Sequence, residues 1–291
     1  MPSHPATQAT KDLDKPKGYG HRIGVFDSGL GGLSVLRALQ KQLPCAEMLY
    51  VADSRNAPYG EKDQTFILQR SEIIADFLLH QGAQVIVIAC NTATAAAVQH
   101  LRSRWPDVAI VGVEPGVKPA VSATENGNVG VMATPGTLAS PKFRTLIERH
   151  KNHANITVQP CPGLAAEIEG GDLDTPRLRE LVARFSKPLS DAHVDTVVLG
   201  CTHYPFVRPL LEQTLGSKIR LIDTSDAIAK HVQSVVDKLP ASHTRHTPAA
   251  DKHEHIASTQ AKFWTSGDPA HLNKTVKNWL QLDIKAERFP S

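Results

Sequence analysis

The sequence predicts an α/β fold of two similar doubly wound parallel-sheet domains, with the active site in the cleft between them. Short apolar runs alternate with amphipathic segments, as in parallel sheets whose strands are connected by helices. A length of 291 residues suits two domains of roughly 150 residues each. Two stretches of the chain also repeat one order of strand, polar turn and cysteine, which indicates two related halves.

The first half opens with an apolar run at 22–26 that leads into the glycine-rich turn Asp27-Ser28-Gly29-Leu30-Gly31-Gly32. Leucines at helical spacing predict a helix over 33–43, which Pro44 ends. The run at 85–89 is apolar throughout, as is typical of a strand covered on both faces. The same criteria predict strands at 48–52 and 109–113 and a helix at 66–79.

The second half continues this alternation. Ser140-Pro141 and Thr175-Pro176 each place a capping hydroxyl before a proline at the first helical position, so two helices are expected to begin there. Strands are predicted at 129–133, 156–159, 196–200 and 219–222, and a further strand is predicted at 262–265, near the end of the chain.

Composition excludes several classes of protein. Lys and Arg number 32 against 29 Asp and Glu, and the charges form no block that would indicate a nucleic-acid partner. No apolar run approaches the roughly 18 residues of a membrane-spanning helix, and residues 1–20 lack the apolar core of a secretory signal. The four cysteines are too few for a disulfide framework. We therefore expect free thiols in a reducing, cytoplasmic setting.

Residues 241–260 interrupt the alternation and contain His243, His246, His253 and His255. Their spacing matches no zinc motif. We therefore expect a solvated surface insertion and no metal site.

Each half delivers a cysteine from the carboxyl end of an apolar strand. Cys90 lies 63 residues after Asp27, and Cys201 lies 67 residues after Thr134. Asp27 and Thr134 each stand at the end of a predicted strand that contains a glycine. Ligands of open α/β sheets bind at such strand ends, so we expect the two cysteines to stand on opposite sides of one cleft.

A cysteine at a strand end is often only a buried core residue. Here the flanking Asn91-Thr92 and Thr202-His203 favour chemistry, because a thiolate gains from a helix N-terminus and a nearby proton partner. Cys45 and Cys161 lack such neighbours and are expected to be structural. One thiol with a histidine is typical of covalent catalysis. Two thiols on opposite faces of a carbon instead predict proton removal and delivery, which is racemisation without a cofactor.

Four motifs resemble the signatures of bacterial glutamate racemases and keep the family's order over nearly the whole chain from residue 21. They are Phe26-Asp27-Ser28-Gly29-Leu30-Gly31-Gly32, Ala57-Pro58-Tyr59-Gly60, Ala89-Cys90-Asn91-Thr92-Ala93-Thr94 and Gly200-Cys201-Thr202-His203-Tyr204-Pro205. The resemblance implies an isomerase that interconverts L- and D-glutamate for peptidoglycan biosynthesis, without pyridoxal phosphate, metal or another cofactor. It also implies domains of 21–114 plus 222–291 and of 115–221. The polar composition of residues 1–20 predicts a flexible N-terminal extension before them.

The resemblance assigns roles to single residues. Cys90 and Cys201 look like the two catalytic bases, and Asp27 and His203 like their proton-handling partners. Glu169 resembles a third catalytic acid, although Gly170 stands where the family often has an acidic residue. No Arg or Lys lies inside the motifs, so hydroxyls, amides and helix dipoles are expected to hold the substrate's carboxylates. Substrate contacts are implied at Asp27, Ser28, Tyr59, Gly60, Asn91, Thr92, Thr134, Thr137, Thr202 and His203.

The partner that the resemblance implies is glutamate itself. The N-terminal extension resembles the branch whose members need UDP-N-acetylmuramoyl-L-alanine as an activator. Family members form different dimers or stay monomeric, so a homodimer stays open.

Three alternatives also stay open. The same cysteine pair could act on aspartate or a related amino acid. The turn after the first strand, with Asp53 ending the next one, could bind a dinucleotide, although Ser34 replaces the third glycine of that fingerprint. A non-enzymatic binding protein, such as a DNA gyrase inhibitor, could use a set of cations that has no interleaved aromatic residues, namely Arg102, Arg104, Arg144, Arg149 and Lys151.

Overall fold

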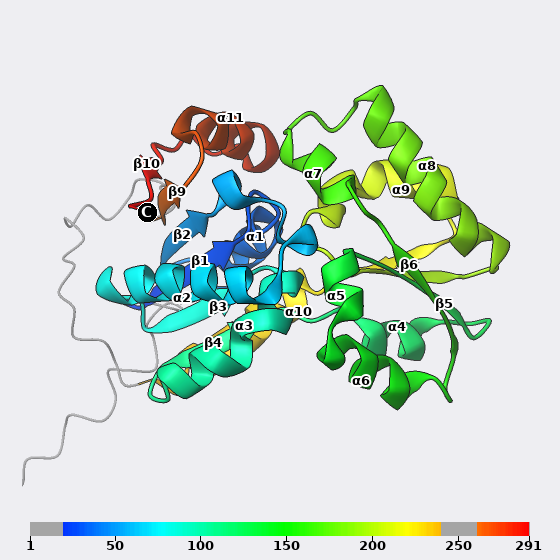
Figure 1. The fold of residues 1–291 in the computed structure, drawn as a ribbon, viewed down its shortest axis with the longest axis horizontal. Helices are drawn as coiled ribbons and strands as arrows, with labels where there is room; N and C mark the ends of the chain where they lie inside the picture. Colours follow the sequence, from blue (N-terminus) through cyan, green and yellow to red (C-terminus); the bar gives the residue numbers. More distant parts are fainter. Residues whose placement is uncertain (1–19, 240–260, 291) are drawn as a thin grey trace, which may run out of the picture.

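The computed structural model describes residues 20–239 and 261–290, which form two parallel β-sheets with helices on both faces (Figure 1). The predicted α/β fold of two doubly wound domains is therefore confirmed. The predictions for residues 1–19 and for the four histidines of 241–260 lie outside the described residues. Within the described parts of the chain, no helix combines the length and the apolarity that a bilayer crossing needs.

The first sheet is built from both ends of the described chain. All its strands are parallel, in the order β10-β9-β2-β1-β3-β4. They are β1 (Arg22–Asp27), β2 (Glu47–Ala52), β3 (Val85–Ile88), β4 (Ala109–Gly112), β9 (Ala261–Thr265) and β10 (Glu287–Arg288). Only the two-residue β10 was not predicted, because so short a strand leaves no periodic signal.

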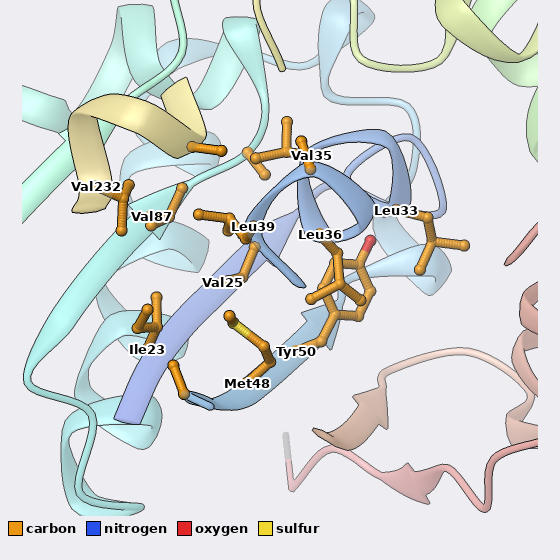
Figure 2. Packing of buried hydrophobic residues seen from close by; sticks show 14 of the residues in the cluster. Ile23, Val25, Leu33, Val35, Leu36, Leu39, Met48, Tyr50, Val87 and Val232 are labelled. Carbon is orange, nitrogen blue, oxygen red and sulfur yellow. The ribbon is translucent and has the colours of Figure 1, made fainter. Parts of the chain in front are cut away.

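Helices cover both faces of this sheet because successive side chains of a strand point to opposite faces. Ile23 and Val25 of β1 pack among residues of α1 (Leu33–Gln42), α10 (Ser225–Val236) and α11 (Pro269–Leu280), as Figure 2 shows in part. Phe26 of the same strand packs on the other face, against α2 (Gln64–His80) and α3 (Asn91–Arg104).

The second sheet has the order β6-β5-β7-β8, again with parallel strands. They are β5 (Asn128–Ala133), β6 (Asn155–Pro160), β7 (Thr196–Leu199) and β8 (Arg220–Ile222). Helices α7 (Leu164–Glu169), α8 (Pro176–Asp191) and α9 (Arg208–Leu215) cover one face. Helices α4 (Val117–Ala123) and α6 (Pro141–His150) cover the other, and α5 (Pro135–Ala139) follows β5.

The two predicted helix starts are confirmed. The Ser140 hydroxyl accepts a hydrogen bond from the backbone N–H of Phe143 at 3.1 Å. The Thr175 hydroxyl accepts one from the N–H of Leu178 at 3.0 Å. Each cap satisfies a donor that the first helical turn leaves without a partner.

The internal repeat is visible in the topology. The core order β2-β1-β3-β4 of the first sheet matches the order β6-β5-β7-β8 of the second. The chain passes to the second sheet after β4 and returns after β8. In the matching strand orders, β3 and β7 hold equivalent places. The proposed domain limits, 21–114 plus 222–291 and 115–221, stay a prediction.

Candidate active site

Cys90 stands where β3 ends and α3 begins. Its extended backbone makes it the N-cap of α3, and its sulfur accepts a hydrogen bond from the N–H of Ala93 at 3.4 Å. The thiol in turn donates to the Ser28 hydroxyl, 3.7 Å away on the turn after β1. Burial, together with the nearby charge of Asp27, raises the pKa of Cys90 to about 12. Cys90 is therefore a protonated thiol at neutral pH.

Cys201 holds the equivalent place after β7 and heads a chain of three polar groups. Its sulfur lies 3.7 Å from Nδ1 of His203, whose Nε2 lies 2.7 Å from Oε2 of Glu169. A carboxylate can only accept, so Nε2 carries a proton and Nδ1 faces the thiol. Burial lowers the pKa of His203, but its hydrogen bonds to Cys201 and Glu169 outweigh burial and raise that pKa well above its ordinary value.

Asp27 connects the two halves. It is fully buried, and its Oδ1 accepts a hydrogen bond from the N–H of Gly29 at 2.8 Å. Its Oδ2 accepts one from the hydroxyl of Thr202 at 3.0 Å, beside Cys201. Burial raises the pKa of Asp27, even though the charge of His203 and these hydrogen bonds act in the opposite direction.

Glu169 ends α7 and contacts the glycine-rich turn of the other half. Its Oε2 accepts from the N–H of Leu30 at 2.8 Å, and its Oε1 accepts from the hydroxyl of Ser54 at 2.9 Å. The fit is close: a Cβ at Gly29 would lie 2.2 Å from Oε1. With His203, this carboxylate has donors from both halves of the chain.

Three buried threonine hydroxyls form a second contact between the halves. Thr92, from the start of α3, lies 3.0 Å from Thr134 and 3.2 Å from Thr137. Gly60 belongs to the same region, since a Cβ there would lie 2.7 Å from the Cβ of Thr134. Asn91 is also buried beside Thr92, at the first position of α3.

Tyr59 is buried, and its hydroxyl donates to Oδ2 of Asp53 at 2.5 Å. Both oxygens of Asp53 also accept from the guanidinium of Arg70, at 3.0 and 2.9 Å. The dinucleotide alternative needs Asp53 as a ribose acceptor, yet this carboxylate is buried and already satisfied. The sequence singled out Asp53 only as a possible ribose acceptor, and its contacts with Tyr59 and Arg70 were not predicted. Ser54 and Arg70 were not predicted either, because neither stands out in the sequence motifs.

Within residues 20–239 and 261–290, no group of three or more His, Cys, Asp or Glu side chains is placed to hold a metal ion. The four cysteines are free thiols. Cys161, which was expected to be structural, is buried in the core of the second half.

The protein has two α/β halves, and each half carries a buried cysteine at an equivalent strand end. Polar groups surround both cysteines. This arrangement defines a two-domain protein with a candidate site built on a pair of thiols. The chain belongs to the Asp/Glu/hydantoin racemase family, whose model matches residues 23–232. The resemblance seen in the motifs is therefore confirmed at the level of the family.

Among individual relatives, a glutamate racemase of Pseudomonas syringae pv. tomato is 49% identical over 292 residues, which is 99% of each chain. A solved glutamate racemase of Bacillus anthracis has a TM-score of 0.78 and 27% identity, covering 93% of this chain and 97% of its own. The Escherichia coli glutamate racemase was solved with L-glutamate and the activator UDP-MurNAc-ala. It has a TM-score of 0.77 and 28% identity, and covers 92% of this chain and 97% of its own.

Proposed function

We propose that this protein interconverts L- and D-glutamate without a cofactor and so supplies D-glutamate for peptidoglycan biosynthesis. The observation that carries the proposal is the pair of buried thiols, Cys90 and Cys201, at equivalent strand ends of two similar halves. The glutamate racemases that match nearly the whole chain support the choice of substrate.

In this proposal each thiol serves one face of the α-carbon. From L-glutamate, the Cys201 thiolate removes the α-proton, and the Cys90 thiol delivers a proton to the opposite face. The raised pKa of Cys90 supports this direction, because Cys90 then rests as a donor. In the same proposal His203, whose Nδ1 lies 3.7 Å from the Cys201 sulfur, takes the proton of Cys201. Asp27 is the carboxylate beside Cys90. From D-glutamate the two thiols exchange roles.

The substrate's charged groups are held by the buried hydroxyls and amides around the thiols. Hydroxyls and helix N-termini bind carboxylates without the strong positive charge that a bidentate Arg would add. Because the hydroxyl of Tyr59 is bonded to Asp53, we assign the backbone of Tyr59 and Gly60 to the substrate. The other proposed contacts are Asp27, Ser28, Asn91, Thr92, Thr134, Thr137, Thr202 and His203.

Circular dichroism of the purified protein with L-glutamate and no added cofactor tests the proposal. We expect the signal to decay to zero as the racemic mixture forms, and the signal of L-aspartate to stay constant. Decay with L-aspartate alone would establish the aspartate alternative. Constant signals with both amino acids would contradict the proposed racemisation.

Three finer points belong to the same proposal. We propose that UDP-N-acetylmuramoyl-L-alanine activates the protein, because this nucleotide is the activator bound to the Escherichia coli relative. Turnover measured with and without the nucleotide tests the point.

We also propose that the protein forms a homodimer, which analytical ultracentrifugation would measure. We further propose a cytoplasmic location, because the four free cysteines stay reduced in that compartment.

A further inference from the structure

We infer that Arg70 and Asp53 are positioning residues: they fix the loop that carries Tyr59 and Gly60, and thereby set the affinity for the substrate without taking part in proton transfer. This inference rests on the proposed function, in which the backbone of that loop contacts glutamate. Its evidence is a buried ion pair just behind the loop.

The ion pair is bidentate. Nε and Nη2 of Arg70 lie 3.0 and 2.9 Å from the two oxygens of Asp53, which is fully buried. Such a planar fork fixes direction as well as distance. Arg70 therefore holds the Asp53 carboxylate in one orientation.

The remaining side-chain donors to Asp53 come from the loop itself. The Tyr59 hydroxyl donates at 2.5 Å, and the side-chain amide of Asn56 lies 3.0 and 3.1 Å from the two oxygens. The backbone N–H of Asn56 also donates to the carbonyl of Asp53 at 2.9 Å. The carboxylate thus ties both ends of the 53–59 segment to α2, the helix that carries Arg70.

Arg70 is itself held from behind by the last described residues. Its guanidinium carbon lies 5.8 Å from the centre of the Phe289 ring. Phe289 is buried, and its N–H donates to the carbonyl of Thr265 in β9 at 2.8 Å. A cation over an aromatic face is attracted to it, so the arginine has little freedom to move away from Asp53.

The side of the loop that faces the second half is also tightly packed. A Cβ at Gly60 would lie 2.7 Å from the Cβ of Thr134, and a Cβ at Gly136 would lie 2.9 Å from the carbonyl oxygen of Gly60. The loop is therefore confined between the ion pair and the start of α5. Moving its rear anchor must displace the backbone that faces the substrate.

The test compares racemisation kinetics of the wild type with those of Arg70→Met, Arg70→Lys and Tyr59→Phe. A contact made equally in the bound substrate and in the transition state changes KM and leaves kcat. For Arg70→Met we expect a KM for both enantiomers about tenfold higher, with kcat within about threefold, as for the loss of roughly one charge-assisted hydrogen bond. Arg70→Lys should recover part of the affinity, and Tyr59→Phe should raise KM to a smaller extent.

Glu47→Gln is the matched control, because it breaks another partly buried ion pair, between Arg22 and Glu47, at the opposite end of β1 and β2. It should lower thermal stability and leave KM unchanged. An unchanged KM in folded Arg70→Met and Tyr59→Phe, or an equal rise in Glu47→Gln, would overturn the inference. If Arg70→Met does not fold, the KM of Tyr59→Phe alone decides whether the inference holds. Failure of the proposed function is distinguishable, because the wild type would then not racemise glutamate.

Discussion

At the scale of single residues, the two thiols differ in their surroundings although their strands are equivalent. Cys90 contacts a hydroxyl and a backbone N–H, and its neighbouring charge is the Asp27 carboxylate. Cys201 contacts an imidazole that a carboxylate orients. A two-base reaction needs one protonated and one deprotonated thiol at a time, and these unequal surroundings support such a division.

Serine variants test whether each thiol serves one face. A hydroxyl fills the space of the thiol but is far too weak an acid to act as a thiolate. With a glutamate analogue that carries a leaving group at the β-carbon, one proton removal suffices for elimination. Cys90→Ser should therefore retain elimination from the L-configured analogue and lose it from the D-configured one, and Cys201→Ser should show the reverse. Equal loss of both activities in both variants would contradict the two-base arrangement.

Cys161 offers a test of pH-dependent stability at a buried thiol that the proposed proton transfer does not use. Burial raises the pKa of its thiol from 9.0 to about 12. Between these values the unfolded chain has lost this proton and the folded chain keeps it, so stability falls as the pH rises. From pH 8 to 10, urea unfolding should show the wild type losing about 1 kcal/mol more than Cys161→Ala. Cys45→Ala keeps the buried thiol and should behave like the wild type.

At the scale of elements, the glycine-rich turn after β1 determines how closely the halves approach. A Cβ at Gly29 would overlap the carboxylate of Glu169, and one at Gly31 would lie 2.3 Å from Nδ1 of His203. These glycines are needed for close approach, which the absence of a side chain allows. A larger side chain at this turn would therefore displace Glu169 or His203, the two residues linked to Cys201.

Gly29→Ala should lower kcat/KM about 100-fold, the scale of a roughly 1 Å misplacement of reacting groups. Gly127→Ala is the control: its φ of +79° makes alanine unfavourable, but no atom lies within 4 Å of the added Cβ. It should cost about 1 kcal/mol of stability and leave turnover unchanged. Steady-state kinetics and thermal melts measure both. Full turnover in Gly29→Ala would show that the Glu169 side chain can move away from the added methyl group without affecting catalysis.

The elements that the sequence predicts well are those with a local signal. The apolar runs before Cys90 and Cys201, and the hydroxyl–proline pairs at Ser140 and Thr175, need only neighbouring residues. The contact of Glu169 with the N–H of Leu30 joins residues 139 positions apart and depends on how the halves pack. Likewise, nothing local distinguishes Arg70 from an exposed arginine of an amphipathic helix, since its partner is set by the path of a loop.

At the scale of the whole molecule, the candidate site lies where the two halves meet. Both thiols, Asp27 and His203 are buried, and hydrogen bonds cross between the halves at Glu169 and at Thr92. Cys90 and Cys201 are only 6% and 7% exposed, so we expect glutamate to reach them through some separation of the two halves. We therefore expect binding to be coupled to opening and closing of the halves, with the two chain passages between the sheets as the hinges.

Hydrogen exchange measured by mass spectrometry tests this coupling. With saturating D-glutamate, amides in peptides covering 28–34 and 164–170 should exchange about tenfold more slowly, because the closed state protects them. Peptides covering β5, in the core of the second sheet, should be unaffected. Equal protection throughout the chain would indicate general stabilisation in place of closure, and no protection at 28–34 would contradict closure at that turn.

The position of β9 has a consequence for biosynthesis. This strand pairs with β2 in parallel, from Met48 opposite Ala261 to Ala52 opposite Thr265, although over two hundred residues of chain separate the partners. On the ribosome, the first sheet can gain this neighbour only once the C-terminal part of the chain has emerged. The second sheet is continuous in sequence, from Asn128 to Ile222, and has all its strands earlier. The nascent protein should therefore complete its second half first, and a stop codon shortly before β9 should leave the first half the more vulnerable to proteolysis.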